Sequence, residues 1–381
     1  MRGCTRPCLV HLAGLRPDKQ MDHRPHLDRV VLAMRDTHRD EASGPVPQSI
    51  GGASAFELLA ATLQEAGFTF SHYEGGGAPD GRAVVLWDIG SFARPPRVPT
   101  DSVLIAWTLE SPLVAHRAFG RLASIARESR ALLTFPGAEP LVEQRGRFVP
   151  IFYPNRWRER SATLDWGSRD LLVMVNSNKR AHPGVEMMTW GNPYRATRIA
   201  AAATLARVRR LRGELSLLDL YEARLDALEH FSKVPGFSLY GVGWDRPPVG
   251  RPSLRIGDVY AGPAGSKAEA LNASKFCLCY ENTSFPGYIT EKIFDCFFAG
   301  TIPVYLGAPD VTEHIPSDTF VDARTFRSMD ELGKRLLSMS EDEGRIHLAA
   351  AARFVDSDRF KRFSDEAFVN AFVTLIHELA S

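Results

Sequence analysis

Apolar and polar positions alternate along the first half of the chain in a pattern that predicts strands separated by helices. Short apolar runs recur there, and residues 54–68 between two of them carry apolar side chains at helical spacing. The runs expected to form strands are RVVLAM (29–34), AVVLWDIG (83–90), SVLIAWTLE (102–110) and ALLTFP (131–136), and a second helix is expected near 115–127. Near-continuous apolar strands that alternate with helices are typical of a parallel sheet covered on both faces.

The same pattern restarts after a polar, aromatic stretch at 147–170, which shows neither the periodicity of a helix nor that of a strand. LLVMVNSN, FSLYGVGW, KFCLCYE and TIPVYLG are predicted as strands, with helices expected at 194–233, 288–299, 328–340 and 358–379. Two αβ halves joined by a linker describe an α/β protein with two facing Rossmann-like domains and a cleft between them. We expect a disordered leader at 1–28, a first domain at 29–155 and a second domain, closed by the C-terminal helices, at 156–381.

Length and charge agree with this organisation and exclude several classes of partner. A chain of 381 residues is longer than one hydrophobic core usually supports. With 46 basic and 45 acidic residues the net charge is +1, so no global field draws the chain to nucleic acid or anionic lipid. No apolar run is long enough to span a bilayer. The N-terminus lacks the sustained apolar segment of a signal peptide.

The cysteines favour a reducing compartment. There are five of them and none has CxxC spacing. Cys277 and Cys279 alternate with apolar residues in a predicted strand, which indicates buried thiols instead of a disulfide or a zinc site. We therefore expect a cytoplasmic protein; whether it associates peripherally with the inner face of a membrane is left open.

The segment ENTSFPGYITEK (281–292) crowds polar side chains at a junction between a predicted strand and a helix. Ligand sites of parallel sheets lie at such junctions. The helix is expected to begin near Tyr288, with Thr290, Glu291 and Lys292 in its first turn. A Glu suits the positive end of a helix dipole, whereas a Lys does not. A bound phosphate at the helix start would remove that conflict; the alternative is that Lys292 reaches water and pairs with Glu291.

This segment and the IFDCFFAGTIPVYLG and IPSDTF stretches that follow resemble the signature of the alpha-1,3/1,4-fucosyltransferases, glycosyltransferase family 10. That signature runs F/Y-E-N-S, a spacer, Y-I/V-T-E-K, an aG-t-I/V-P block and a P-x-S-F segment. The resemblance extends over about 173–326, and WTLESP near 102–112 adds a thinner match. Thr283 and Thr319 stand where the pattern has Ser, which are conservative departures.

The resemblance implies a GT-B enzyme that transfers fucose from GDP-fucose to a glycan hydroxyl with inversion, without a metal or cofactor. It implies that Lys292 and Arg198 hold the diphosphate, and the register leaves Arg195 open as the alternative to Arg198. It implies that Glu291 holds a sugar or ribose hydroxyl. Tyr288 and Asn282 would shape the nucleotide pocket and Asn178 would line it. Glu110, which follows an apolar strand of the first domain, would be the general base.

Two other functions remain open at this stage. The same scaffold could use another GDP-sugar, because Lys292, Arg198 and Glu291 would serve any sugar nucleotide. A non-catalytic protein that binds a nucleotide sugar or a glycan is the second alternative, although a binding module has no need of a base such as Glu110. The DSD triplet at 356–358 has the spacing of a metal-binding DxD, but it precedes an amphipathic helix and is better explained as a helix N-cap.

Overall fold

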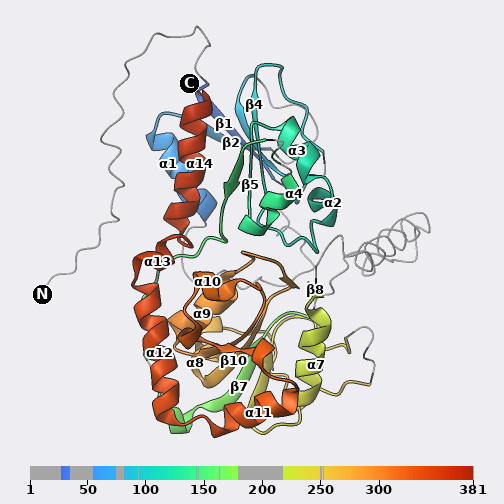
Figure 1. The fold of residues 1–381 in the computed structure, drawn as a ribbon, viewed down its shortest axis with the longest axis vertical. Coiled ribbons are helices and arrows are strands. Elements are labelled where there is room, and N and C mark those ends of the chain that lie inside the picture. Colours follow the sequence, from blue (N-terminus) through green and yellow to red (C-terminus); the bar gives the residue numbers. More distant parts are fainter. Residues whose placement is uncertain are drawn as a thin grey trace, which may run out of the picture.

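The structure is a computed structural model that describes residues 27–34, 55–73, 81–92, 94–142, 144, 146–162, 164–178, 218–248, 251 and 253–380. It contains two parallel sheets, one in each half of the chain (Figure 1). The expected α/β architecture of two facing Rossmann-like domains is therefore confirmed.

The first sheet has six parallel strands in the order β2-β1-β3-β4-β5-β6. Their bounds are β1 (Arg29–Ala33), β2 (Thr69–Tyr73), β3 (Val84–Asp88), β4 (Val103–Trp107), β5 (Ala131–Thr134) and β6 (Phe148–Pro150). The sequence pattern did not predict β2 or β6. Both are edge strands with only partly buried or exposed residues, so they lack the apolar run that marks the central strands.

Helices cover both faces of this sheet. The helices of the first half are α1 (Ala55–Glu65), α2 (His116–Phe119), α3 (Leu122–Glu128) and α4 (Glu139–Val142). The single helix expected at 115–127 is thus two helices. The chain leaves helical geometry at Arg121, which has φ −132° and ψ 13°, so α3 starts again at Leu122.

The second sheet has five parallel strands in the order β13-β12-β10-β7-β9, and β8 and β11 form a separate antiparallel pair. The strands are β7 (Asp170–Val175), β8 (Leu218–Asp219), β9 (Phe237–Tyr240), β10 (Ser274–Tyr280), β11 (Thr283–Ser284), β12 (Ile302–Leu306) and β13 (Val321–Asp322). The helices are α7 (Tyr221–Phe231), α8 (Lys267–Asn272), α9 (Glu291–Ala299), α10 (Val311–His314), α11 (Met329–Ser338), α12 (Glu341–Val355), α13 (Asp358–Lys361) and α14 (Asp365–Ala380).

The last helix corrects the expected domain division. Helix α14 was assigned to the second domain, yet Figure 1 shows it beside α1 and the first sheet. Phe368 and Phe372 belong to the core formed by β1, β3, β4 and α1. The expected helix at 358–379 is interrupted at residues 362–364, which form a turn between α13 and α14. The break lets the chain cross from one domain to the other.

Parts of the expected organisation lie outside the described residues. They are the leader up to residue 26, and most of the predicted helical region at 194–233, including both Arg195 and Arg198. Leu27 is described and buried, and its N–H donates to the carbonyl of Ala380 at 3.1 Å. Among the described residues, none of the helices combines the length and apolarity that a membrane span requires.

Candidate active site

The 281–292 segment leaves the carboxyl end of β10 and enters α9. Helix α9 begins at Glu291, three residues later than expected, and Thr290 is its N-cap residue in an extended conformation. The helix cannot include Tyr288 because Thr290, two residues later, is extended, with φ −101° and ψ −171°. Ile289, Ile293, Cys296 and Phe297 are buried in one cluster as expected, but Ile289 precedes the helix.

A buried carboxylate lies at the start of α9. Glu281 has no exposed surface, and its Oε1 accepts from the backbone N–H of Thr290 at 2.8 Å. Its Oε2 accepts from the ammonium of Lys292 at 2.9 Å, and Lys292 also donates to Thr290 Oγ1 at 2.9 Å. The protein thus supplies its own anion where the sequence pattern suggested a phosphate. The alternative pairing with Glu291 is present at 3.9 Å, but Lys292 is only 17% exposed and lies closer to Glu281, so its side chain does not extend into water.

The ionisation states around Lys292 are set by competing effects. Burial disfavours the ammonium, but Glu281 and Glu291 outweigh it and raise the pKa of Lys292 above its ordinary value. Burial by itself would raise the pKa of Glu291, but Lys292 and Lys267 have the larger combined effect and lower it below its ordinary value. At neutral pH both side chains are charged.

Arg224 is a second cation at this site, and the sequence pattern did not single it out. It projects from α7, is 5% exposed, and donates from Nη2 to the Tyr280 carbonyl at 2.9 Å and to Asn282 Oδ1 at 2.7 Å. The positive charge of Arg224 lowers the pKa of Lys292, an effect smaller than that of the two carboxylates. Because these acceptors are neutral oxygens, Arg224 keeps its charge uncompensated by these bonds.

Two further cations share one carboxylate. Asp295, one turn into α9, forms ion pairs with Arg158 and with Lys267, the latter at 2.5 Å. Taken with the Lys292 pair and Arg224, four cations meet three carboxylates: Arg158, Lys267, Arg224 and Lys292 against Glu281, Glu291 and Asp295. Three of these cations are paired with a carboxylate, whereas the bonds of Arg224 described above go to neutral oxygens.

The first domain contributes Glu110 from the carboxyl end of β4. Glu110 is exposed, and its N–H donates to Thr108 Oγ1 at 3.1 Å. A side chain on Gly90 would place its Cβ 3.1 Å from Glu110 Cγ, so the glycine leaves room for the carboxylate.

The pKa values of two tyrosines are raised by carboxylates of both domains. Glu291 and burial raise the pKa of Tyr153, and Glu110 adds a smaller contribution. Burial raises the pKa of Tyr288, with further contributions from Glu281, Glu291 and Glu110. Tyr153 lies in the segment expected to be a linker, where no motif marked it. Glu110 of the first domain and the carboxylates at the start of α9 thus both raise the pKa of these two tyrosines.

Comparison with known proteins identifies the second half of the chain. Residues 224–347 match the model of the C-terminal part of glycosyltransferase family 10 (fucosyltransferase). Less than half of the chain takes part in this match. Within it lie the β10–α9 junction, Arg224 and the whole 281–292 segment.

Individual relatives agree with this assignment. The chain is 46% identical to an alpha-(1,3)-fucosyltransferase of Helicobacter pylori over 66 residues, which are 17% of this chain and 14% of that protein. It is 33% identical to a putative fucosyltransferase-like protein of Arabidopsis thaliana over 117 residues, 30% of this chain and 23% of that one. These alignments span less than a quarter of either relative.

Solved structures show the same fold over nearly the whole chain. A glycosyltransferase from Rickettsia africae aligns with a TM-score of 0.51 and 10% identity, covering 93% of this chain and 98% of that one. An alpha1,3-fucosyltransferase crystallised with GDP aligns with a TM-score of 0.49 and 15% identity, covering 95% and 94%. The architecture is of the GT-B type.

Asn178 supports a neighbouring loop. It follows β7, and its amide donates to the carbonyls of Gly243 at 2.9 Å and Arg246 at 3.1 Å. Both bonds hold the loop after β9. The structure therefore gives Asn178 a place beside that loop, while Asn282 is bonded to Arg224 within the cation cluster.

The DSD triplet does not form a metal site. Asp356 pairs with Arg160 at 2.9 Å and Asp358 pairs with Lys361 at 2.6 Å. Ser357 is the N-cap residue of α13, although its side chain makes no capping bond. Over the described part of the chain, no group of three or more His, Cys, Asp or Glu side chains is arranged to hold a metal ion.

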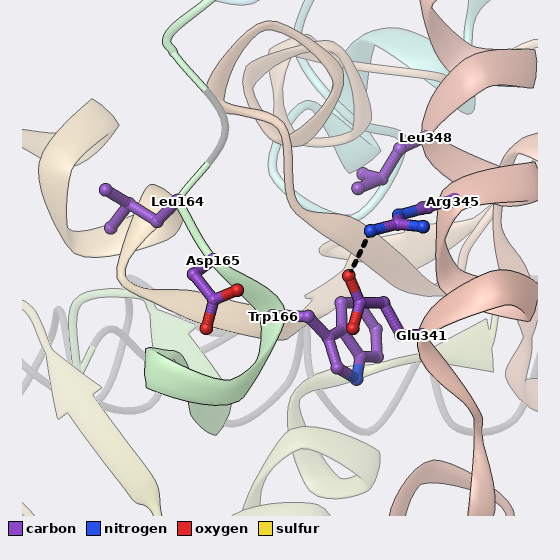
Figure 2. Close-up of a pocket in the computed structure, with 6 residues that line it drawn as sticks. All are labelled: Leu164, Asp165, Trp166, Glu341, Arg345 and Leu348. Atoms are coloured by element: carbon purple, nitrogen blue, oxygen red, sulfur yellow. Dashed lines mark hydrogen bonds and ion pairs between the residues drawn. The ribbon is translucent and has the colours of Figure 1, made fainter.

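One surface pocket lies away from these residues. It has a volume of about 220 Å³ and is lined by Leu164, Asp165, Trp166, Glu341, Arg345 and Leu348 (Figure 2). Trp166 precedes β7, whereas Glu110 and Glu281 follow their strands. The pocket is thus near the amino end of the second sheet and includes none of the predicted site residues.

Proposed function

We propose that the protein is an inverting, metal-independent fucosyltransferase that moves fucose from GDP-fucose to a hydroxyl of a glycan. The observation that supports this proposal is the pair of largely buried cations, Lys292 and Arg224, at the β10–α9 junction, inside the region similar to the fucosyltransferases. Transfer needs a base on one side of the sugar and charge stabilisation on the other, and the two domains supply one each.

In the proposed reaction the acceptor hydroxyl gives its proton to Glu110 as its oxygen attacks the anomeric carbon. The bond between that carbon and the diphosphate oxygen breaks, and its electron pair leaves with GDP. Lys292 and Arg224 stabilise the departing diphosphate, since Arg224 is a buried cation bonded only through neutral acceptors in the contacts described above. A single displacement inverts the anomeric configuration.

The other predicted residues keep their proposed roles. Glu291 holds a hydroxyl of the donor, Asn282 and Tyr288 shape the nucleotide pocket, and Asn178 supports its edge through the loop after β9. Arg198, which lies outside the described residues, stays a candidate diphosphate ligand together with Arg195. The presence of several fixed cations supports a reaction that needs no metal or other cofactor. We keep a cytoplasmic location as part of the proposal.

A donor panel tests this function directly. Purified protein is incubated with GDP-fucose and, separately, with other GDP-sugars, and both hydrolysis and transfer to oligosaccharide acceptors are measured with EDTA and with manganese. We expect turnover of GDP-fucose above that of the other donors, and equal stabilisation of the protein by GDP under both conditions. Preference for another GDP-sugar would change the donor. GDP binding without turnover of any donor would favour a binding protein.

A further inference from the structure

The turn at residues 285–288 lies in the second half of the chain but packs into the core of the first domain. Phe285 and Tyr288 are 7% and 4% exposed and belong to the same cluster as Phe119 and Phe135. The ring of Phe285 meets Phe119 edge-on at 5.6 Å, and the ring of Tyr288 meets Phe135 edge-on at 5.0 Å. The 285–288 turn, which belongs to the second half of the chain, is therefore packed into the core of the first domain.

Two glycines permit a very close approach of the two backbones at this turn. Gly137 of the first domain donates its N–H to the Pro286 carbonyl at 3.2 Å. A Cβ on Gly137 would lie 2.6 Å from that carbonyl oxygen, and a Cβ on Gly287 would lie 2.6 Å from Pro136 Cδ. Either added side chain would push the domains apart at this point.

Asp310 fixes the turn from the side of the second domain. Its Oδ1 accepts from the Gly287 N–H at 2.9 Å, and its Oδ2 lies 3.2 Å from Nε2 of His314. Burial opposes the charge of Asp310, but the bonds from His314 and Gly287 lower its pKa overall. The Asp310 carboxylate is thus charged, and one of its oxygens accepts a hydrogen bond from the turn.

We propose that the 285–288 turn is an interdomain latch, and that Asp310 is the positioning residue that holds it. This inference rests on the proposed function, because the latch matters for transfer only if Glu110 acts on a donor held at α9. Tyr288 is two residues before Thr290, so a shift of the turn moves the start of α9 relative to Glu110. The latch sets the distance between the base and the cations.

The first test removes the acceptor on the side of Asp310. In Asp310→Ala, hydrogen exchange at the Gly287 amide should become faster, and kcat should fall by about 10- to 100-fold because the reacting groups are misplaced. Asp310→Asn keeps an oxygen that can accept the hydrogen bond from Gly287. It should therefore restore most of the protection of the Gly287 amide and most of kcat. Asp330→Ala is the matched control, since Asp330 is 78% exposed in the first turn of α11.

The second test acts from the first domain without touching Asp310. Gly137→Ala should lower kcat by a similar factor and weaken GDP binding by clearly less, because the cations of α9 and α7 keep their contacts while Tyr288 shifts with the turn. Gly257→Ala is its control, as a Cβ there meets nothing within 4 Å and its φ is not positive. In Gly137→Ala, exchange should rise both at the 135–138 peptide and at 285–289.

The outcomes separate the latch from the proposed function. Unchanged exchange at 285–289 in both Asp310→Ala and Gly137→Ala would overturn the latch. GDP affinity lost as severely as kcat, or an Asn variant no better than Ala, would also overturn it, since either indicates a merely structural effect. If the wild-type protein turns over no donor, the proposed function fails, while the exchange measurements still decide whether the turn joins the domains.

Discussion

At the scale of single residues, the site depends on buried or half-buried charges whose partners come from distant parts of the sequence. Lys292 is held by Glu281 on the preceding strand end, and Arg224 of α7 is held by oxygens of the β10–β11 connection. In such a site the loss of one partner affects more than one contact, because the other charge stays buried.

The pair of Lys292 and Glu281 gives the first prediction. Lys292→Met keeps the length of the side chain but leaves Glu281 buried without its cation, which should cost on the order of 3 kcal/mol of unfolding free energy. The double variant Lys292→Met/Glu281→Gln should regain most of that loss. Thermal and urea unfolding measure both effects. Lys361→Met is the control, because Lys361 is 77% exposed and should change stability little. If the loss of unfolding free energy in the double variant equals the sum of the losses in the two single variants, Lys292 and Glu281 are not coupled.

Glu110 gives the second prediction, on activity. Glu110→Gln preserves shape but removes the proton acceptor, so the transfer rate should fall by about 10²- to 10⁴-fold. GDP affinity, measured by calorimetry, should stay nearly unchanged because Glu110 belongs to the other domain. Glu139→Gln serves as a control, since Glu139 is an exposed residue of α4. Wild-type turnover in Glu110→Gln would remove it as the base, and a large loss of GDP affinity would assign it to the donor site.

At the scale of elements, the predictability of the fold follows from burial. Central strands such as β3, with every residue buried, were predicted from their apolar runs. The half-exposed edge strands β2 and β6 were not, because they are short and lack a continuous apolar run. The start of α9 was placed too early because Ile289 is buried in the same cluster as the helix, while the backbone at Thr290 is extended. Local spacing cannot report such a backbone constraint.

The β10–α9 layer gives a prediction about thiol reactivity. Cys277, Cys279 and Cys296 are free and buried between this strand and this helix, as the strand spacing predicted for the first two. Burial raises the pKa of the Cys279 and Cys296 thiols, so little thiolate is available to react. All three should resist alkylation in the native protein and react in urea, as read by peptide mass spectrometry. Rapid native labelling of Cys277 and Cys279 would show that β10 is not buried.

Helix α14 gives a prediction about the first domain. Phe372 has no exposed surface, and its ring lies 4.9 Å from Phe368 and 6.0 Å from Trp107 of β4. Phe372→Ala should destabilise the first domain by about 3–5 kcal/mol. Hydrogen exchange should then rise in β1 and β4 more than in β10. Thr374→Ala, an exposed position of the same helix, should have little effect. Equal loss of protection in both sheets would mean that the domains do not unfold separately.

At the scale of the whole molecule, the sequence indicated which segments belong to the site but not how they pair. The family signature singled out Glu291, Lys292 and Glu110, and the structure places the first two side by side at the start of α9. It could not indicate that Glu281 neutralises Lys292, because that requires the turn of 281–290 to fold back on itself. It could not indicate Arg224 either, since an Arg within an ordinary amphipathic helix has no distinguishing spacing.

The path of α14 has a consequence for how the protein is made. The first sheet is complete once residue 150 has been synthesised, but the helix that covers α1 and one face of that sheet comes from the last residues of the chain. During translation the apolar face formed by Leu32, Leu86 and Trp107 therefore lacks its covering helix while the ribosome synthesises the second domain. A nascent chain arrested before α14 should bind chaperones and be cut readily by protease in its first half, and release of the full chain should abolish both.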